Sequence, residues 1–352
     1  MFRSLVKGAK KLAIGESGGA PASELFPKVD PEVDGEDCLR DCDNCPTHYP
    51  KGFKIEETDD IYGGVKAWST HVLVATGKSD WSHNVADEKG SVMQAIDRAD
   101  KPSNGRLMLS ASNMPTPTHS SDYSEPTTLL LLPAFAVVHN VTPASVPALV
   151  SEYINRSPTN TSALEPVSAA AIPASLPPPG LHDPAPKLHG LTSHPSPHSV
   201  LILLCSQKTR DARCGQSAPL IKKELQRHLR PLGLYRDLDD ERPGGVGIYF
   251  ISHVGGHKYS ANVIIYRRPD PFGLDALERV NLKDGESLTP RKRDPTKDDG
   301  PDAGAGQCIW LARVKPEDCE GIVKYTVLQG KVVKPEQQLR GGFDRARGLM
   351  SW

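Results

Sequence analysis

The sequence predicts an α/β protein of two domains joined by a Pro-rich linker. In both halves of the chain, short β-branched runs alternate with segments of helical periodicity, which indicates alternating strands and helices. Between the halves, residues 156–197 are dominated by Pro, Ala, Ser and His, and Leu176-Pro177-Pro178-Pro179 favours extended polyproline geometry. A chain of 352 residues is long enough for two such domains.

The composition excludes several classes of protein. The chain has 42 Lys and Arg against 43 Asp and Glu, so its net charge of −1 gives no support for nucleic-acid binding. Pro133 interrupts the most apolar run, 129–138, which is far shorter than the roughly 20 residues that span a bilayer. We therefore expect a soluble protein with no membrane partner. Seven clustered cysteines favour a reducing compartment and metal or thiol chemistry over disulfides.

Residues 1–49 are expected to form a mobile N-terminal region. Met1 to Ile14 carries four cations and no acidic residue, a pattern shared by short amphipathic helices and by mitochondrial presequences. We favour a solvated tail over a presequence. Residues 15–36 are rich in Gly, Pro and acidic side chains and are expected to be disordered.

Three cysteines, Cys38, Cys42 and Cys45, follow closely in this region. They are candidates for a metal site or a redox switch, but a tetrahedral site needs a fourth ligand, and His48 is the only near one. The neighbouring aspartates raise thiol pKa values, which works against reactivity. We interpret the segment as thiols in a mobile loop and assign no site to it.

The N-terminal α/β domain is expected at residues 50–155. Gly77-Lys-Ser-Asp80 follows its first strand, but the upstream glycines of a Walker sequence are missing, so we predict no nucleotide site. The predicted strands are 68–76, 107–110 and 127–138, and the predicted helices are 87–100 and 145–154.

The second domain is expected at residues 198–340, with a mobile insert at 267–306 and a C-terminal tail at 341–352. Its order of strands and helices resembles a thioredoxin-like fold. Its predicted strands are 200–204, 246–251, 262–266 and 307–314, and its predicted helices are 217–229 and 316–328.

The second domain also carries the candidate functional site. Cys205 and Cys214 follow its first apolar strand, and His253 and His257 follow its second. A rigid strand that ends in a polar loop suits a metal site, and two Cys with two His make a complete four-ligand set. A structural zinc and a [2Fe–2S] cluster both accept this set. A blue-copper site uses one thiolate, so it fits this set poorly. The remaining alternative is that the four residues bind nothing and are buried in the core.

The motifs around these ligands are specific. Cys205-Ser-x-x-Thr-Arg-Asp-x-Arg-Cys214-Gly, then Gly233-Leu-Tyr-Arg-Asp, then His253-Val-Gly-Gly-His257 closely resemble the fungal actin-patches-distal proteins of the sucrase/ferredoxin-like family. The close resemblance runs from about Val200 to Arg267. It implies a thioredoxin-like ferredoxin domain whose non-Rieske [2Fe–2S] cluster is held by Cys205, Cys214, His253 and His257. The insert 267–306 departs from the pattern and leaves the redox-partner surface open.

The side chains beside the ligands are expected to support this chemistry. Gly255 and Gly256 allow positive φ and a close approach to a cluster. Arg210, Arg213 and Lys258 supply positive charge that would stabilise the reduced state. Each histidine ligand keeps one ring nitrogen free, so we expect proton uptake to accompany electron uptake.

A second candidate site lies at Met350-Ser351-Trp352. A terminal Trp after a small polar residue resembles the tail that brings client proteins to the cytosolic iron–sulfur assembly targeting complex. We therefore expect this complex as a partner, and a cytoplasmic protein, with the nucleus as a second compartment and mitochondria disfavoured.

The sequence thus favours an electron carrier over an enzyme with its own substrate. The family resemblance implies links to actin patches and to metal or oxidant tolerance. The alternative is a zinc-stabilised Cys2His2 interaction module, and a third hypothesis uses Cys38, Cys42 and Cys45 as redox thiols. The electron donor and acceptor are not identified.

Overall fold

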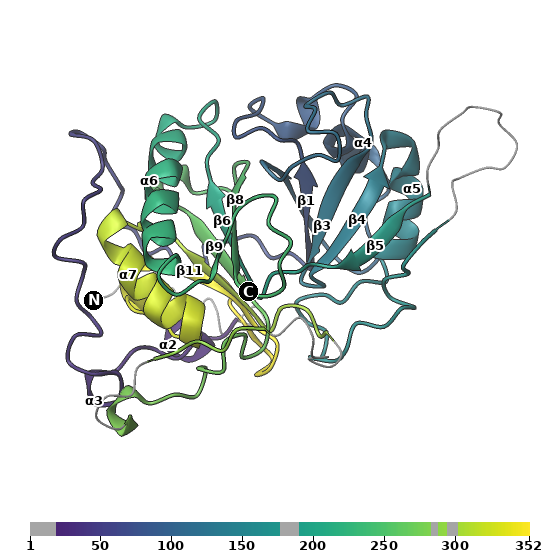
Figure 1. The fold of residues 1–352 in the computed structure, drawn as a ribbon. Helices are drawn as coiled ribbons and strands as arrows, with labels where there is room; N and C mark the ends of the chain where they lie inside the picture. The colour runs from purple at the N-terminus through teal and green to yellow at the C-terminus, as the bar shows by residue number, and fades with distance from the viewer. Residues whose placement is uncertain (1–18, 177–189, 283–287, 294–301) are drawn as a thin grey trace, which may run out of the picture.

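Strands from both halves of the chain form one mixed, 12-stranded β-sheet (Figure 1). The computed structural model describes residues 19–176, 190–282, 288–293 and 302–352. The sheet order is β12-β11-β10-β9-β6-β8-β2-β1-β3-β4-β5, with β7 beside β8. The predicted α/β class is confirmed, whereas the thioredoxin-like arrangement of the second half stays a prediction.

The strands are β1 Thr70–Ala75, β2 Leu107–Ser112, β3 Thr127–Leu132, β4 Ala136–Val141, β5 Thr192–Pro195, β6 Val200–Cys205, β7 Tyr235–Arg236, β8 Val246–Ile251, β9 Val263–Arg267, β10 Gln307–Leu311, β11 Leu339–Asp344 and β12 Leu349–Met350. The α-helices are α2 Ala22–Leu25, α3 Pro31–Asp34, α4 Val92–Arg98, α5 Val146–Leu149, α6 Ala212–Leu229, α7 Cys319–Gly321 and α8 Pro335–Gln338. Short 3-10 turns are η1 Val85–Asp87, η2 Pro143–Ser145, η4 His257–Tyr259, η5 Arg279–Asn281 and η6 Pro316–Asp318, and π-helical turns are η3 Val150–Ile154 and η7 Ile322–Val327.

The two halves of the sheet meet along a narrow join. β2 and β8 share a single antiparallel register pair, Ser112 with Ile251. The Ser252 amide donates to the Ala111 carbonyl at 2.9 Å, and the Phe250 amide donates to the Asn113 side chain at 2.7 Å. With so few ladder bonds, this join relies on side-chain packing to hold the halves together.

That packing is a core shared by the inner faces of both half-sheets. Leu73 of β1, Leu130 of β3, Leu203 of β6 and Trp310 of β10 belong to one buried cluster. Successive side chains of a strand point to opposite faces, so Ile202 packs into a different cluster under the helices. Both faces of β6 are therefore buried, which explains its uninterrupted aliphatic sequence.

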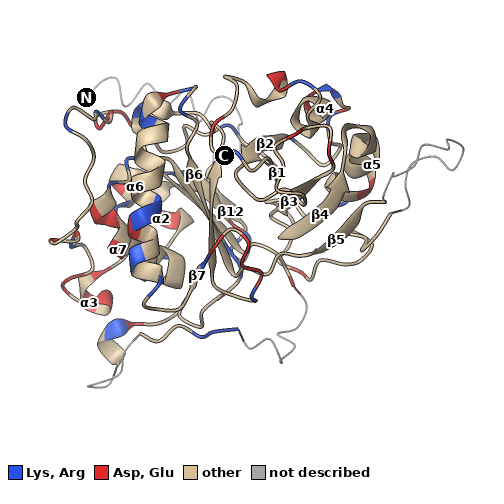
Figure 2. Ribbon diagram, turned by 45° about the horizontal axis from the view of Figure 1, so that its top comes forward, with Lys and Arg blue, Asp and Glu red and all other residues tan. Residues whose placement is uncertain are grey.

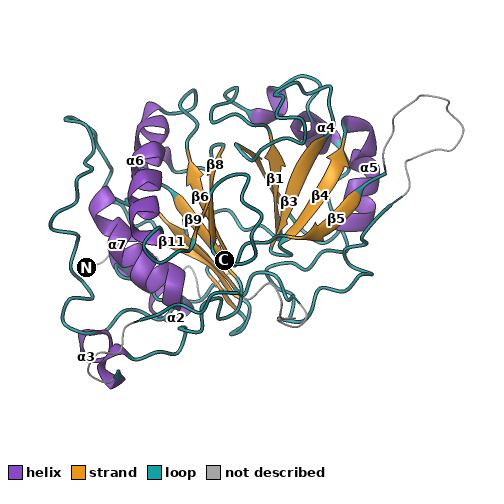
Figure 3. Cartoon of the chain, in the orientation of Figure 1, coloured by secondary structure: helices purple, strands orange, loops and turns teal. Residues whose placement is uncertain are grey.

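The helices cover the outer faces of the two half-sheets. α6 and η7 pack over β6, β8 and β9, and α4 and α5 pack over β1, β3 and β4 (Figure 3). None of the described helices combines the length and the apolar character that crossing a bilayer requires.

Some segments differ from the sequence-based expectation. The helix expected at 217–229 begins at Ala212, because the Asp211 side chain caps it by accepting from the Arg213 amide. β5 lies within the segment expected as a linker, and β12 lies within the segment expected as a tail. The presequence-like residues 1–14, the prolines 177–179 and parts of the insert lie outside the described residues.

One buried histidine links the two inner faces. His71 of β1 hydrogen-bonds through Nδ1 to the Tyr266 hydroxyl of β9 at 3.1 Å and through Nε2 to Ser110 Oγ at 2.9 Å. Its side chain is fully buried, and burial lowers its pKa from the ordinary 6.5 to about 3. The ring is therefore neutral in the folded protein over most of the acid range.

Replacing His71 is expected to flatten the acid dependence of stability. Below about pH 6.5 the unfolded chain binds a proton that folded His71 refuses until about pH 3, so the unfolding free energy falls with falling pH in this window. The slope assigned to His71 is at most about 1.4 kcal/mol per pH unit. Urea unfolding at a series of pH values should show a shallower slope for His71→Gln than for His119→Gln, an exposed control. Equal slopes would contradict the prediction.

Candidate metal centre

Two parallel strands bring the predicted ligands to one edge of the sheet. β6 and β8 are neighbours in parallel register, with Cys205 opposite Ile251. Cys205 is the last residue of β6, and His253 lies two residues beyond the end of β8. Because parallel strands share the same direction, the loops that follow them leave from the same edge, which is where α/β sheets place ligands.

Cys214 reaches this edge from the first turn of α6. It is buried like Cys205, and the two Sγ atoms lie 3.4 Å apart. Two sulfur ligands of one tetrahedral ion lie about 3.8 Å apart, given metal–sulfur bonds of about 2.3 Å. The two thiols are thus close to the spacing of a shared metal.

The two histidines lie beside the thiols, at different distances. His253 Nδ1 lies 3.9 Å from Cys205 Sγ, and the ligand atoms of Cys205, Cys214 and His253 all fall within 4.8 Å of one another. His257 is outside that tight group, but its ring centroid lies 5.2 Å from that of His253. Its Nδ1 is buried and has no hydrogen-bond partner among the described residues. An orphaned ring nitrogen beside three ligands fits a group that accepts four.

Local contacts shift the pKa values of the candidate ligands in different directions. The hydrogen bond between the Cys205 and Cys214 sulfur atoms lowers the pKa of Cys205, and amides of Val254 and Gln207 add to this effect. The same contact, together with burial, raises the pKa of Cys214. Burial and the neighbouring His253 lower the pKa of His257, so its ring is held in the neutral form that binds metals.

The cations that the sequence singled out are paired locally. Arg213 makes two hydrogen bonds to Asp211, through Nε at 2.9 Å and Nη2 at 2.8 Å. Lys258 pairs with Asp59, and Arg210 Nη1 contacts His83 Nδ1 at 2.6 Å. The carboxylates offset the charges of Arg213 and Lys258, so the field that they impose on the ligands is weaker than expected.

A buried cation that sequence reasoning missed lies behind the histidine loop. Arg340 of β11 is 3% exposed, and it donates to the Gly255 carbonyl at 3.1 Å and to Asn262 Oδ1 at 2.7 Å. Both acceptors are neutral, and burial lowers its pKa to about 10. A Cβ at Gly256, where φ is +69°, would lie 2.7 Å from the guanidinium. The positive φ was predicted, but the close approach at Gly256 is to Arg340.

The N-terminal half supports the cysteine loop. Gln207 donates to the Ser82 carbonyl at 2.5 Å and accepts from the His253 amide at 2.8 Å, so it joins both ligand loops to residues 79–83. Asp80 accepts from the Thr209 amide at 3.0 Å and from its hydroxyl at 2.8 Å. The loop after β1, which resembles a phosphate loop in sequence, thus braces the candidate metal centre.

The other predicted residues lie elsewhere. Cys38 is buried beside Tyr325, and burial raises its pKa and that of Cys45. Trp352 packs its ring on Trp68, with centroids 4.2 Å apart, and Met350 pairs with Phe343 across β12 and β11. Ser351 Oγ accepts from the Gly342 amide at 3.0 Å. The segment 350–352 is therefore docked on the molecule in this conformation.

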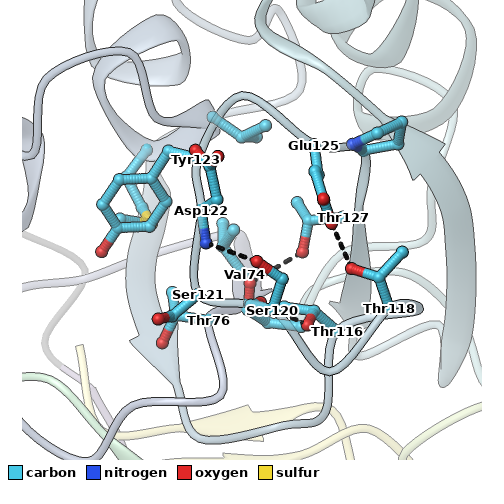
Figure 4. Close-up of a pocket in the computed structure, with 14 residues that line it drawn as sticks. Val74, Thr76, Thr116, Thr118, Ser120, Ser121, Asp122, Tyr123, Glu125 and Thr127 are labelled. Atoms are coloured by element: carbon cyan, nitrogen blue, oxygen red, sulfur yellow. Dashed lines mark hydrogen bonds between the residues drawn. The ribbon is translucent and has the colours of Figure 1, made fainter.

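A separate pocket at the end of β1 and β3 is too small for a substrate. Figure 4 shows its rim, where Thr118 bonds to Glu125 and the Asp122 amide donates to Ser120 Oγ at 3.1 Å. Its volume is about 10 Å³, which is about the space of one water molecule.

Comparison with known proteins gives the family. The sucrase/ferredoxin-like family model matches residues 61–341. The chain is 29% identical to Actin patches distal protein 1 of Saccharomyces cerevisiae over 72% of this chain and 78% of that protein.

Two further relatives share the name Altered inheritance of mitochondria protein 32. The proteins of Clavispora lusitaniae and Debaryomyces hansenii are 28% and 32% identical, over 39% and 38% of this chain and 33% of each relative. No solved structure matches the chain significantly. On the match over residues 61–341, the chain belongs to the sucrase/ferredoxin-like family.

Proposed function

We propose that this protein is a one-electron carrier that holds a [2Fe–2S] cluster through Cys205, Cys214, His253 and His257. The observation that carries the proposal is the convergence of three of these ligands within 4.8 Å at the ends of β6 and β8. The orphaned Nδ1 of His257 supplies the fourth. When bound, such a cluster supplies reversible one-electron transfer, and imidazole in place of thiolate raises its potential.

The proposed ligands differ in their exposure to solvent. The two thiols are buried, whereas the His257 side chain is 44% exposed, so the histidine side is the edge that a redox partner can approach. Arg340 places a positive charge behind the histidine loop, and this charge favours the reduced, more negative state of a bound cluster. A ring nitrogen of His257 on the exposed edge can exchange a proton with water.

The alternative function is a zinc-stabilised Cys2His2 module. The 3.4 Å distance between the thiols suits zinc as well as iron, and structural zinc accepts two Cys and two His. Such a protein would be colourless and redox-silent, which separates the two proposals at once.

The cellular setting is also a proposal. We place the protein in the cytoplasm, with the nucleus as a second compartment, and link it to actin patches and to metal or oxidant tolerance. The name of the relative from Saccharomyces cerevisiae supports the first link. We further propose that Met350, Ser351 and Trp352 dock to the cytosolic iron–sulfur assembly targeting complex, for which Trp352 must leave Trp68.

Anaerobically purified protein is expected to contain about two irons per chain, with broad visible absorption and a rhombic EPR signal after reduction. His253→Cys and His257→Cys should each lower the midpoint potential, because thiolate replaces imidazole. Cys308→Ala, which removes a buried cysteine outside the group, should keep the spectrum unchanged. Zinc without colour, in protein made with ample iron, would refute the electron-carrier proposal.

The midpoint potential is expected to fall as pH rises through the alkaline range. Reduction adds negative charge beside the imidazole ligands, so it raises the pKa of their free N–H groups and couples proton uptake to electron uptake. Protein-film voltammetry measures the dependence directly. A potential that stays flat from about pH 6 to about pH 10 would rule out this coupling.

Trp352→Ala should lower the iron content of protein isolated from cells while chemical reconstitution restores it. The ring lies against Trp68 and not beside the ligands, so its loss should affect delivery and not binding. Unchanged iron loading in cells would remove the docking proposal, and failed reconstitution would show that the substitution disturbs the fold.

A further inference from the structure

Three metal-ligating side chains from distant segments meet at the far end of α6. Cys42 belongs to the N-terminal loop, His228 to the last turn of α6 and Glu320 to α7. Their ligand atoms all lie within 4.8 Å of one another. Cys214 and His228 share α6, and its rise of about 1.5 Å per residue puts this group about 21 Å from the Cys205 centre.

The loop that carries Cys42 is fixed against η6, the turn directly before α7. The Cys42 amide donates to the Glu317 carbonyl at 3.1 Å. Lys334 bridges Asp41 at 2.6 Å and Asp318 at 2.7 Å, which anchors the preceding residue. The position of Cys42 beside the helices is therefore set by contacts outside the group itself.

One observation points to a ligand. His228 Nε2 is buried and has no hydrogen-bond partner among the described residues, although buried ring nitrogens are normally satisfied. Arg227 Nη2 donates to Cys42 Sγ at 3.3 Å, so this sulfur atom already lies in a polar environment. The group of three side chains thus includes a buried nitrogen atom that no described protein group satisfies.

The surroundings admit a hydrated cation. Cys42 and Glu320 line a polar surface hollow of about 370 Å³, together with Asp41 and Asp43. Acidic and basic positions are interspersed over the α6–α7 face around it (Figure 2). Arg40, Arg227 and Lys324 also line the hollow, so its charge is mixed, and the hollow leaves room for a water ligand beside Cys42 and Glu320.

We propose that Cys42, His228 and Glu320 bind Zn²⁺, with water as the fourth ligand, and so tie the N-terminal loop to α6 and α7. One thiolate, one imidazole and one carboxylate form a mixed set that zinc accepts in a tetrahedron with an open position. The proposal is independent of the cluster proposed at Cys205.

The neighbouring cysteines are not part of this site and serve as controls. Cys38 packs in an apolar cluster with Val29, Tyr325 and Val333. Cys45 donates its thiol hydrogen to the Thr47 carbonyl at 3.2 Å. Of the three thiols in the loop, Cys42 alone is grouped with a histidine and a carboxylate in the described structure.

The test is equilibrium dialysis of the full-length protein against Zn²⁺, with zinc and iron per chain measured together. Wild-type protein should bind about one zinc, and Cys42→Ala and His228→Ala should each weaken its binding at least about tenfold. Cys38→Ala and Cys45→Ala should bind it as wild type does. Because iron is counted in the same samples, zinc that enters the Cys205 centre is recognised by lost iron.

A second measurement reports on the loop itself. The Arg40 side chain is 68% exposed, so trypsin can cut after it. Zn²⁺ should slow this cut in wild-type protein and leave it unchanged in Cys42→Ala. A zinc affinity and stoichiometry that neither Cys42→Ala nor His228→Ala changes, or the lack of any binding by wild-type protein, would overturn the proposal.

Discussion

The parallel pairing of β6 with β8 is the constraint on which the site depends. All six residues of β6 are buried, and the strand contributes side chains to the inner core and to the core beneath α6. Aliphatic packing on both faces fixes the register that places Cys205 opposite Ile251. The polar loops are then held at one edge without needing to be rigid on their own.

Charge at the site is arranged by the tertiary fold more than by the loop sequence. Arg213 and Lys258 are neutralised by Asp211 and Asp59. The buried cation comes instead from Arg340, on β11, and Asn262 holds it in place. A guanidinium buried against neutral acceptors keeps its field because little solvent screens it.

The sequence was sufficient to single out Cys205, Cys214 and His253, which the structure brings together, and to predict most individual elements. Cys205 and His253 each follow an apolar run, and that local pattern requires no knowledge of distant contacts. Pairing between β2 and β8 was not predictable, since one register pair leaves no periodic signal. The positions of Arg340 and Glu320 were not predictable either, because each residue reaches its neighbours only through packing between segments that are distant in the sequence. The early start of α6 depends on the cap that Asp211 forms with the Arg213 amide, and apolar periodicity alone does not reveal this cap.

The bracing of the cysteine loop by residues 79–83 has a consequence for modularity. Gln207 and Asp80 connect the ligand loops to the other half of the molecule, and Ser206 Oγ donates to the Ser79 carbonyl at 2.8 Å. The half that carries the candidate ligands is therefore not a transplantable unit: a fragment beginning at residue 198 would keep all four side chains yet lose the partners that orient the cysteine loop. Any recombination that separates the two halves would remove the contacts between residues 79–83 and the cysteine loop.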